Sequence, residues 1–426
     1  MILNFTPWAQ CGEGTSMGRV QTRDWRVGRL RAGTALLLSA AAALSSCSGA
    51  GNGGPDAGVD TFDRRAMFEN LGANVVLPTY RDFAAKALSL EQAAAAWEGA
   101  VGTPTEATTR EAAQQAWRDA MSIWQRAELM QVGPAGAMGS VSGGETLRDE
   151  IYSWPVVSTC RVDQELVAGN FGSPGFFEGA LVNVYGLDAL EYLLFYAAEQ
   201  NTCPPQSPIN ASGQWAALGA AEIQRRRADY AHAAASWLRT VADDLVNRWE
   251  PANGNFVSEL ATAGTTGSIY ETERMAADEL FAAMFYLDLD TKDLKLAIPA
   301  GISATCTANT CPEAVESPWA DFSKEELRGN LEGFRALLTG GEGLGFDDWL
   351  VARDSADLSA QLVTETDAAI AKVDAIPGTL VSALASNPES VRSAHAAVKR
   401  VSDLLKSQFV TVLNLSVPDE GAADND

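Results

Sequence analysis

The stretch Tyr185–Tyr196, YGLDALEYLLFY, is an apolar segment in which Asp188 and Glu191 are the only charged residues. Residues three apart are neighbours on a helix, so both carboxylates are expected on one helix face, with leucines packing beside them. Two adjacent carboxylates in apolar surroundings repel each other and lose hydration. The pair therefore requires a bound cation, an arginine, a shared proton or access to water.

Helical patterns extend from this stretch in both directions. Alanine-rich amphipathic runs cover residues 80–101, 105–131, 176–199, 213–249 and 268–287, and a second series covers 324–338, 354–375 and 388–413. The alternating runs that are typical of strands are scarce. The sequence therefore predicts an all-α protein of two packed helical bundles, with up-and-down helices and long loops.

The two bundles are predicted at residues 75–250, which contain the Gly-x-Asp-x-x-Glu segment, and at residues 268–418. Residues 251–267 are rich in Gly, Thr and Asn and are expected to link the bundles. Residues 419–426 form an acidic tail.

The N-terminal residues have the composition of an export signal. Five arginines precede the apolar run 35–44, and small residues lead to Cys47. The run is too short to span a bilayer, and it resembles a bacterial lipoprotein signal that is cleaved before a lipidated Cys47. Residues 1–46 are predicted to be the signal and residues 47–74 a flexible tether. An ordinary secretory signal is the alternative.

A lipid on Cys47 makes the membrane the predicted partner and the cell envelope the predicted location. Ser48, where an aspartate would favour the inner membrane, favours the outer membrane with the protein facing the periplasm. The net charge of −24 over 426 residues disfavours nucleic acid as a partner.

Four further cysteines follow Cys47 in the chain. An even number in an exported protein suggests two disulfides, for which three pairings exist. Pairing Cys160 with Cys203 and Cys306 with Cys311 keeps each bridge within one half of the chain. A four-thiolate metal site is the alternative, but no Cys-x-x-Cys spacing supports it.

Several segments resemble, in order and spacing, the imelysin family of bacterial cell-envelope proteins. The stretch around Asp188 is similar to the family's Gly-x-His-x-x-Glu segment, with Gly186 and Glu191 matching and Asp188 in the place of the histidine. The other similar segments are Ala116–Pro134 with its Glu128, Ile151–Val156, Val315–Pro318 and Asn330–Gly333.

The resemblance implies an all-helical, two-bundle fold and a link to iron-regulated uptake, and some members have been described as metallopeptidases. Activated water on a metal needs ligands and a general base within reach. This chain has no His-Glu-x-x-His, and its two histidines, His232 and His395, lie in helical patterns that suggest packing or surface roles. No catalytic residue is assigned, and enzyme activity is left open.

The favoured hypothesis is a non-catalytic binding protein associated with uptake of iron or another metal. Glu128, Asp188 and Glu191 are the candidate ligands of an all-oxygen site, which suits a hard cation such as ferric iron, calcium or magnesium. Trp154 and Tyr192 are expected to line the cleft. A small organic or peptide ligand is a second occupant for the same cleft.

Two alternatives stay open from the residues alone. A metallopeptidase could use Asp188 in place of the motif histidine. A structural or interaction module would have no ligand site: Arg118 or Arg274 would neutralise the acids, Asn183 would cap the helix, and Glu191 would pair with an arginine of a neighbouring helix.

Overall fold

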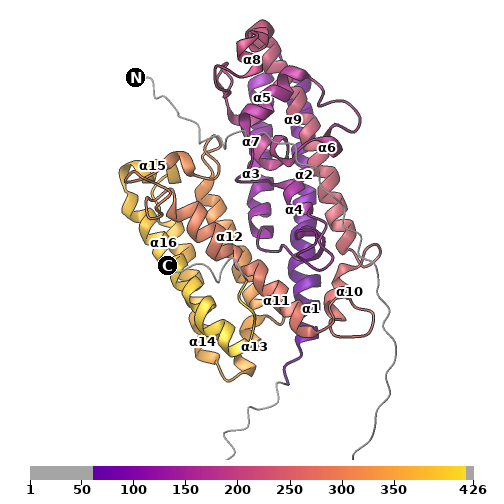
Figure 1. Ribbon diagram of the computed structural model, residues 1–426, viewed down its shortest axis with the longest axis vertical. Coiled ribbons are helices and arrows are strands. Elements are labelled where there is room, and N and C mark those ends of the chain that lie inside the picture. Colours follow the sequence, from indigo (N-terminus) through magenta and orange to yellow (C-terminus); the bar gives the residue numbers. More distant parts are fainter. Residues whose placement is uncertain (1–60, 419–426) are drawn as a thin grey trace, which may run out of the picture. The chain divides into compact units, whose positions relative to one another are not determined.

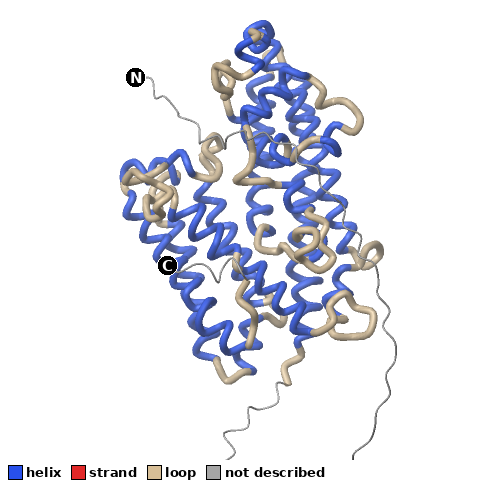
Figure 2. The backbone as a smooth tube through the Cα atoms, in the orientation of Figure 1, coloured by secondary structure: helices blue, strands red, loops and turns tan. Residues whose placement is uncertain are grey.

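The computed structural model describes residues 61–418, so the predicted signal, the lipidation site at Cys47 and the acidic tail lie outside the described residues. The described residues form helices joined by loops, with no β-strand among them (Figure 2). The all-α prediction is confirmed. In residues 61–418, no helix combines the length and the apolar character that crossing a bilayer requires.

Residues 64–261 form a first group of helices, drawn from indigo to pink in Figure 1. Its elements are α1 (Arg64–Asn70), η1 (Leu71–Val76), α2 (Leu77–Ala100), α3 (Glu106–Ala127), η2 (Gly133–Ala135), α4 (Leu147–Ile151), α5 (Thr159–Ala168), α6 (Phe176–Gly179), η3 (Val182–Val184), α7 (Gly186–Phe195), α8 (Pro208–Ala211), α9 (Gln214–Trp249) and α10 (Phe256–Ala261). Helix α2 packs against α3 and α9, and α7 packs against the same two helices. The fully buried Trp97, Trp117 and Trp249 fill the core of this group.

Residues 273–413 form a second group, drawn in orange and yellow in Figure 1. Its elements are α11 (Glu273–Met284), η4 (Leu287–Ala297), η5 (Pro312–Ala314), α12 (Ser323–Thr339), α13 (Phe346–Ala352), α14 (Ala356–Asp374), α15 (Leu380–Ser386), α16 (Pro388–Leu404), η6 (Leu405–Phe409) and α17 (Val410–Leu413). Helix α14 packs against α12 and α16, and the π-helical segment η4 packs against the same two helices. Both predicted disulfides, Cys160–Cys203 and Cys306–Cys311, are present.

Two predicted boundaries differ from the structure. Residues 64–74, predicted to belong to the tether, form α1 and most of η1, because Met67 and Phe68 are fully buried against the helices. The predicted linker contains the short helix α10, whose Phe256 is also buried and packs on Trp249. In both segments a few apolar side chains among polar neighbours are enough to anchor a short helix.

The two groups meet where α12 crosses α3. Two glycines of α12 permit the close approach: a Cβ on Gly329 would lie 2.7 Å from the Cβ of Gln125, and one on Gly333 would lie 2.3 Å from the carbonyl oxygen of Arg126. Between them, the Asn330 side chain donates to the backbone and side-chain oxygens of Gln125, each at 2.8 Å. The contact is therefore backbone against backbone.

Gly333→Ala should lower the free energy of unfolding by about 1–3 kcal/mol, because the added methyl group forces α12 away from α3. Gly99→Ala is the matched control: Gly99 is exposed in α2 with open space around its Cα, so alanine should stabilise the helix by about 0.5–1 kcal/mol. Urea denaturation of both variants measures the difference. Equal effects would show that the α3–α12 contact is not tight.

Candidate functional site

Helix α7, which carries Asp188 and Glu191, begins at Gly186 in a left-handed conformation with φ 88°. Glycine adopts this conformation without strain, and a Cβ here would lie 2.8 Å from the carbonyl oxygen of Ile151. The expectation that Asn183 caps the helix is wrong, because Tyr185 is the N-cap residue and no side chain caps it. The glycine thus brings α7 directly against the segment that follows α4.

Asp188 is buried, and both of its oxygens accept hydrogen bonds: Oδ2 from the Ser153 hydroxyl at 2.8 Å and Oδ1 from the backbone N–H of Ala189 at 2.9 Å. Burial nevertheless dominates and raises the pKa of Asp188 to about 7. The group therefore exchanges a proton near neutral pH.

Glu191 is buried as well, and its Oε1 accepts the backbone N–H groups of Trp319 at 2.9 Å and Ala320 at 2.7 Å. Among the described residues its partners are these backbone N–H groups and not an arginine, so the pairing predicted for the purely structural alternative is wrong. Burial, together with the smaller effects of the nearby Asp188 and Glu316, raises the pKa of Glu191 to about 8. The two motif carboxyls are thus tolerated by keeping protons.

Glu128 is fully buried. It accepts hydrogen bonds from Nε and Nη2 of Arg148, both at 3.3 Å, and from the Tyr286 hydroxyl. Neither arginine proposed from the sequence has this role. Arg118 lies over the ring of Phe195, and Arg274 pairs with Asp278. The cation that balances Glu128 is Arg148, contributed by the short helix α4.

Further buried polar groups, which the sequence did not single out as site residues, complete the network. Glu316 Oε1 accepts from Tyr152 Oη at 2.7 Å, Lys295 Nζ at 2.8 Å and Gln125 Nε2 at 2.9 Å. Lys295 also donates to Asn330 Oδ1 at 2.9 Å. Most of these residues lie within the segments that resemble the imelysin family, and those segments were the signal that could have identified them.

Glu326 of α12 is the last carboxyl of the network. It is fully buried, and its Oε1 accepts from the Ser317 hydroxyl. Burial, followed by the charge of Glu316, raises the pKa of Glu326 well above its ordinary value. The charge of Glu191 also raises the pKa of Glu326.

We refer to the five buried carboxyl groups as the acidic cluster: Glu128, Asp188, Glu191, Glu316 and Glu326. Two cations, the partly exposed Arg148 and the buried Lys295, are bonded to Glu128 and Glu316. The remaining three carboxyls are those whose pKa burial raises. The cluster is therefore electrically balanced when these three groups are protonated, and it loses that balance as the pH rises.

The aromatic residues expected around the site have different roles. The ring of Trp154 lies 5.5 Å from Lys295 Nζ, so it borders the cluster. The hydroxyl of Tyr192 instead donates to Asp163 at 3.0 Å, while its ring packs on Trp319 with centroids 5.2 Å apart. Tyr192 therefore supports the loop that holds Glu191.

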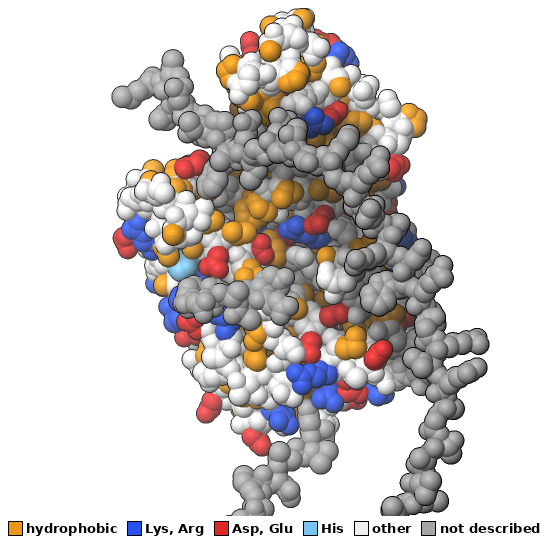
Figure 3. All heavy atoms as spheres, viewed as in Figure 1, with side chains coloured by type: hydrophobic (Ala, Val, Ile, Leu, Met, Phe, Trp, Pro, Cys, Tyr) orange, Lys and Arg blue, Asp and Glu red, His pale blue; other side chains and the backbone are white. Residues whose placement is uncertain are grey.

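A surface cleft of about 330 Å³ approaches the cluster at Tyr286, although none of the five carboxyls lines it. Its lining includes Gln131, Ser140 and Glu279, together with Tyr286, which donates to Glu128, and Asp290. Burial raises the pKa of Asp290 to about 6. On the face shown in Figure 3, acidic and basic side chains are interspersed, so the concentration of acid in the cluster is not a general feature of that face.

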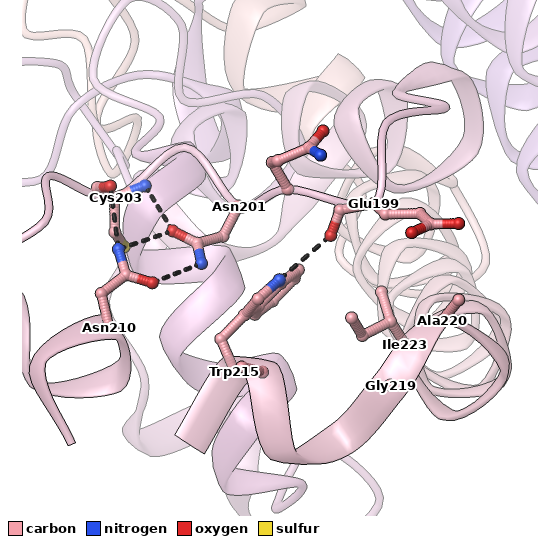
Figure 4. A pocket seen from close by; sticks show the side chains of 10 residues that line it. Glu199, Asn201, Cys203, Asn210, Trp215, Gly219, Ala220 and Ile223 are labelled. Carbon is pink, nitrogen blue, oxygen red and sulfur yellow. Dashed lines mark hydrogen bonds between the residues drawn. The ribbon is translucent and has the colours of Figure 1, made fainter. Parts of the chain in front are cut away.

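A separate pocket of about 440 Å³ lies beside α8 and α9 (Figure 4). The indole of Trp215 donates to the carbonyl of Glu199 at 3.0 Å, and Asn201 and Asn210 bond to each other near Cys203. None of the residues that line this pocket belongs to the acidic cluster. It is therefore not part of the candidate site.

The described residues do not form a preassembled metal site. Within residues 61–418, no group of three or more His, Cys, Asp or Glu side chains is arranged to hold a metal ion. His232 of α9 contacts Glu98 of α2 at 2.5 Å, and His395 lies in α16. Neither histidine therefore contacts Asp188 or Glu191. Asp188 already uses both oxygens in hydrogen bonds.

The described residues thus define an all-helical protein with a buried acidic cluster where two helix groups meet. Residues 76–408 match the model of the Imelysin family, Peptidase M75, and the chain belongs to that family. It is 26% identical over 347 residues to iron-regulated protein A of Synechococcus elongatus, a match that covers 80% of this chain and 84% of the relative.

Two solved structures share the fold. An imelysin-like protein from Psychrobacter arcticum superposes with a TM-score of 0.63 at 16% identity, covering 83% of this chain and 96% of the other. A putative iron-regulated protein A precursor from Parabacteroides distasonis gives a TM-score of 0.59 at 18% identity, covering 81% and 95%. The similarity of these structures supports the fold.

The stability of the protein should depend on pH through Asp188. In the unfolded chain an aspartate ionises near pH 4, whereas folding raises the pKa of Asp188 to about 7. The folded state binds the proton more tightly, so this stabilisation is complete below about pH 4 and is lost as the pH rises to about 7. When the pH rises from about 5 to about 8, the free energy of unfolding of Asp188→Asn should fall by about 2 kcal/mol less than that of the wild type. Urea denaturation at both pH values measures this, with the exposed Glu342→Gln as the control; parallel profiles would contradict it.

Lys295→Met should lower the free energy of unfolding by about 3–5 kcal/mol, because Glu316 is left buried without its cation. Adding Glu316→Gln should restore part of that loss. Lys86→Met, which breaks an exposed pair with Asp119, should cost under about 1 kcal/mol. Strictly additive effects of the Lys295 and Glu316 substitutions in denaturation would refute the pairing.

Proposed function

We propose that the protein is a non-catalytic binding protein of the bacterial cell envelope that binds a hard cation at the acidic cluster. Ferric iron is the cation that we favour. The observation that carries the proposal is the set of three buried carboxyls, Asp188, Glu191 and Glu326, whose proton affinity is raised. Carboxylate oxygens suit hard cations, and the three protons equal the charge of one ferric ion. A relative named for iron regulation supports the choice of metal.

Binding in this proposal is an exchange of protons for a cation. The carboxyls presently accept hydrogen bonds from Ser153, Ser317 and the backbone of Trp319 and Ala320, so the ligands reorient when the metal enters. The cleft at Tyr286 and Asp290 supplies the route. The lipid on Cys47 and a position at the outer membrane, facing the periplasm, complete the proposal and rest on the N-terminal sequence alone.

Calorimetric titration with chelated ferric iron, in two buffers with different ionisation enthalpies, tests the exchange. We expect more than one proton to be released per ion and the affinity to rise as the pH increases through about 7–8, because protons compete for the same oxygens. The double variant Asp188→Asn, Glu191→Gln should release fewer protons and bind at least about tenfold more weakly, a difference of about 1.4 kcal/mol.

Asp163→Asn is the matched control, since Asp163 is another buried carboxyl with a raised pKa, about 6, but lies outside the acidic cluster. It should leave ferric binding unchanged. If the wild type binds no ferric iron, or if the double variant binds it as well as the wild type does, the acidic cluster is a structural device and the proposed function is wrong.

A further inference from the structure

Two guanidinium groups converge on one carbonyl oxygen beyond the end of α7. Arg110 Nη2, from α3, lies 3.3 Å from the Tyr196 oxygen, and Arg227 Nη1, from α9, lies 3.2 Å from the same atom. Arg110 Nε also donates to the Leu194 carbonyl at 2.8 Å. Burial and the charge of Arg227 lower the pKa of Arg110. Helix-end carbonyls attract cations, but two cations this close repel each other.

Arg227 is the more constrained of the two. Its side chain is 2% exposed, and among the described residues its Nε and Nη2 have no hydrogen-bond partner. Its guanidinium carbon lies 5.2 Å from the ring centroid of Tyr196. A buried cation with unsatisfied N–H groups is costly, so this arrangement requires a compensating group.

The carboxyl of Asp163 does not provide that compensation through a hydrogen bond. Its oxygens already accept the Tyr192 hydroxyl at 3.0 Å, and the backbone N–H and hydroxyl of Thr202 at 2.8 and 3.0 Å. Burial is the main influence on Asp163, raising its pKa to about 6, with Arg227 only a smaller, opposing one. The strong donors of Arg227 are thus left for another acceptor.

A surface cavity of about 510 Å³ adjoins the arginine pair. Arg110 lines it, and so do Phe195 and Ala197, which flank Tyr196 in the chain. Gln224, one turn before Arg227 on the same side of α9, also lines it. A small ligand in this cavity therefore reaches Arg110 directly, while Arg227 does not line the cavity and lies behind Arg110 at the shared Tyr196 carbonyl.

The other groups at the arginine pair are already engaged. The Leu194 carbonyl accepts from Gln114 as well as Arg110. Glu106, the acid that acts on Arg110, accepts from the Gly102 N–H at 2.7 Å and from Gln224 at 3.0 Å. An incoming acceptor would thus meet N–H donors of the arginines rather than free carbonyl oxygens.

We propose that a small oxyanion, a phosphate or carboxylate group, binds between Arg110 and Arg227 from this cavity. The planar guanidinium fork matches both groups through paired N–H donors. The anion contacts Arg110 and offsets the repulsion between the two guanidinium groups. It supplies Nε and Nη2 of Arg227 with acceptors when the Arg227 side chain turns toward the cavity. This site shares no residue with the acidic cluster and does not depend on cation binding.

Thermal unfolding of the full chain tests the site, recorded in sodium phosphate, sodium citrate and sodium chloride at equal ionic strength, with calorimetric titration of phosphate and citrate. Phosphate or citrate should raise the unfolding midpoint above its value in sodium chloride. Arg110→Gln should weaken the binding of the anion at least about tenfold. Stronger binding of phosphate identifies a phosphate ligand, and stronger binding of citrate identifies a carboxylate ligand; either result supports the site.

Arg225→Gln is the control, because it removes the same charge from α9 while its guanidinium is occupied by Glu222 at 2.7 Å and by Asp229. It should bind the oxyanion like the wild type. The decision rests on Arg110, which is less buried than Arg227 and whose replacement is better tolerated. The proposal is wrong if neither phosphate nor citrate raises the unfolding midpoint above its value in sodium chloride. It is also wrong if Arg110→Gln shows the same rise in midpoint as the wild type.

Discussion

The burial of five carboxyl groups against two cations is the constraint on which this structure depends. Moving carboxylates out of water is unfavourable, and Arg148 and Lys295 compensate for only two of them. The other three are accommodated by keeping protons and by accepting hydrogen bonds from hydroxyl and backbone N–H groups. The groups that would supply a binding site are thus the same groups that hold the two helix groups together.

The packing around the acidic cluster follows from the same constraint. The close approach of α3 and α12, permitted by Gly329 and Gly333, brings Gln125 against Asn330, and both bond Lys295. Lys295 is positioned by η4, which packs against α12 and α16. A shift of α12 would therefore leave several buried polar groups without partners at once. Such coupling favours a single arrangement of the helices.

Much of this architecture could be predicted from the sequence. Helical spacing predicted the all-α fold, and the parity of the cysteines with their positions predicted both disulfides. The face shared by Asp188 and Glu191 followed from their separation of three residues, and the structure places both in one buried network with Glu128. Local spacing is sufficient for such features because they depend on neighbours along the chain.

Other features depend on contacts that a single sequence does not reveal. Arg148 is separated from Glu128 by 20 residues, and Lys295 from Gln125 by 170, so nothing local indicated these partners over Arg118 or Arg274. The two backbone donors of Glu191 come from a loop more than a hundred residues away. Raised proton affinity arises from burial on every side, which a helical pattern alone does not establish.

The central claim is that carboxyls of the acidic cluster hold protons near neutral pH. Infrared difference spectroscopy between about pH 5 and pH 9 observes this directly, because a protonated carboxyl has a carbonyl stretching band that a carboxylate lacks. We expect bands that disappear as the pH rises through the pKa values of about 7 for Asp188 and about 8 for Glu191. Asp188→Asn and Glu191→Gln should each weaken the corresponding band. Spectra in which the carboxyls are fully ionised by about pH 5, identical in both variants, would contradict it.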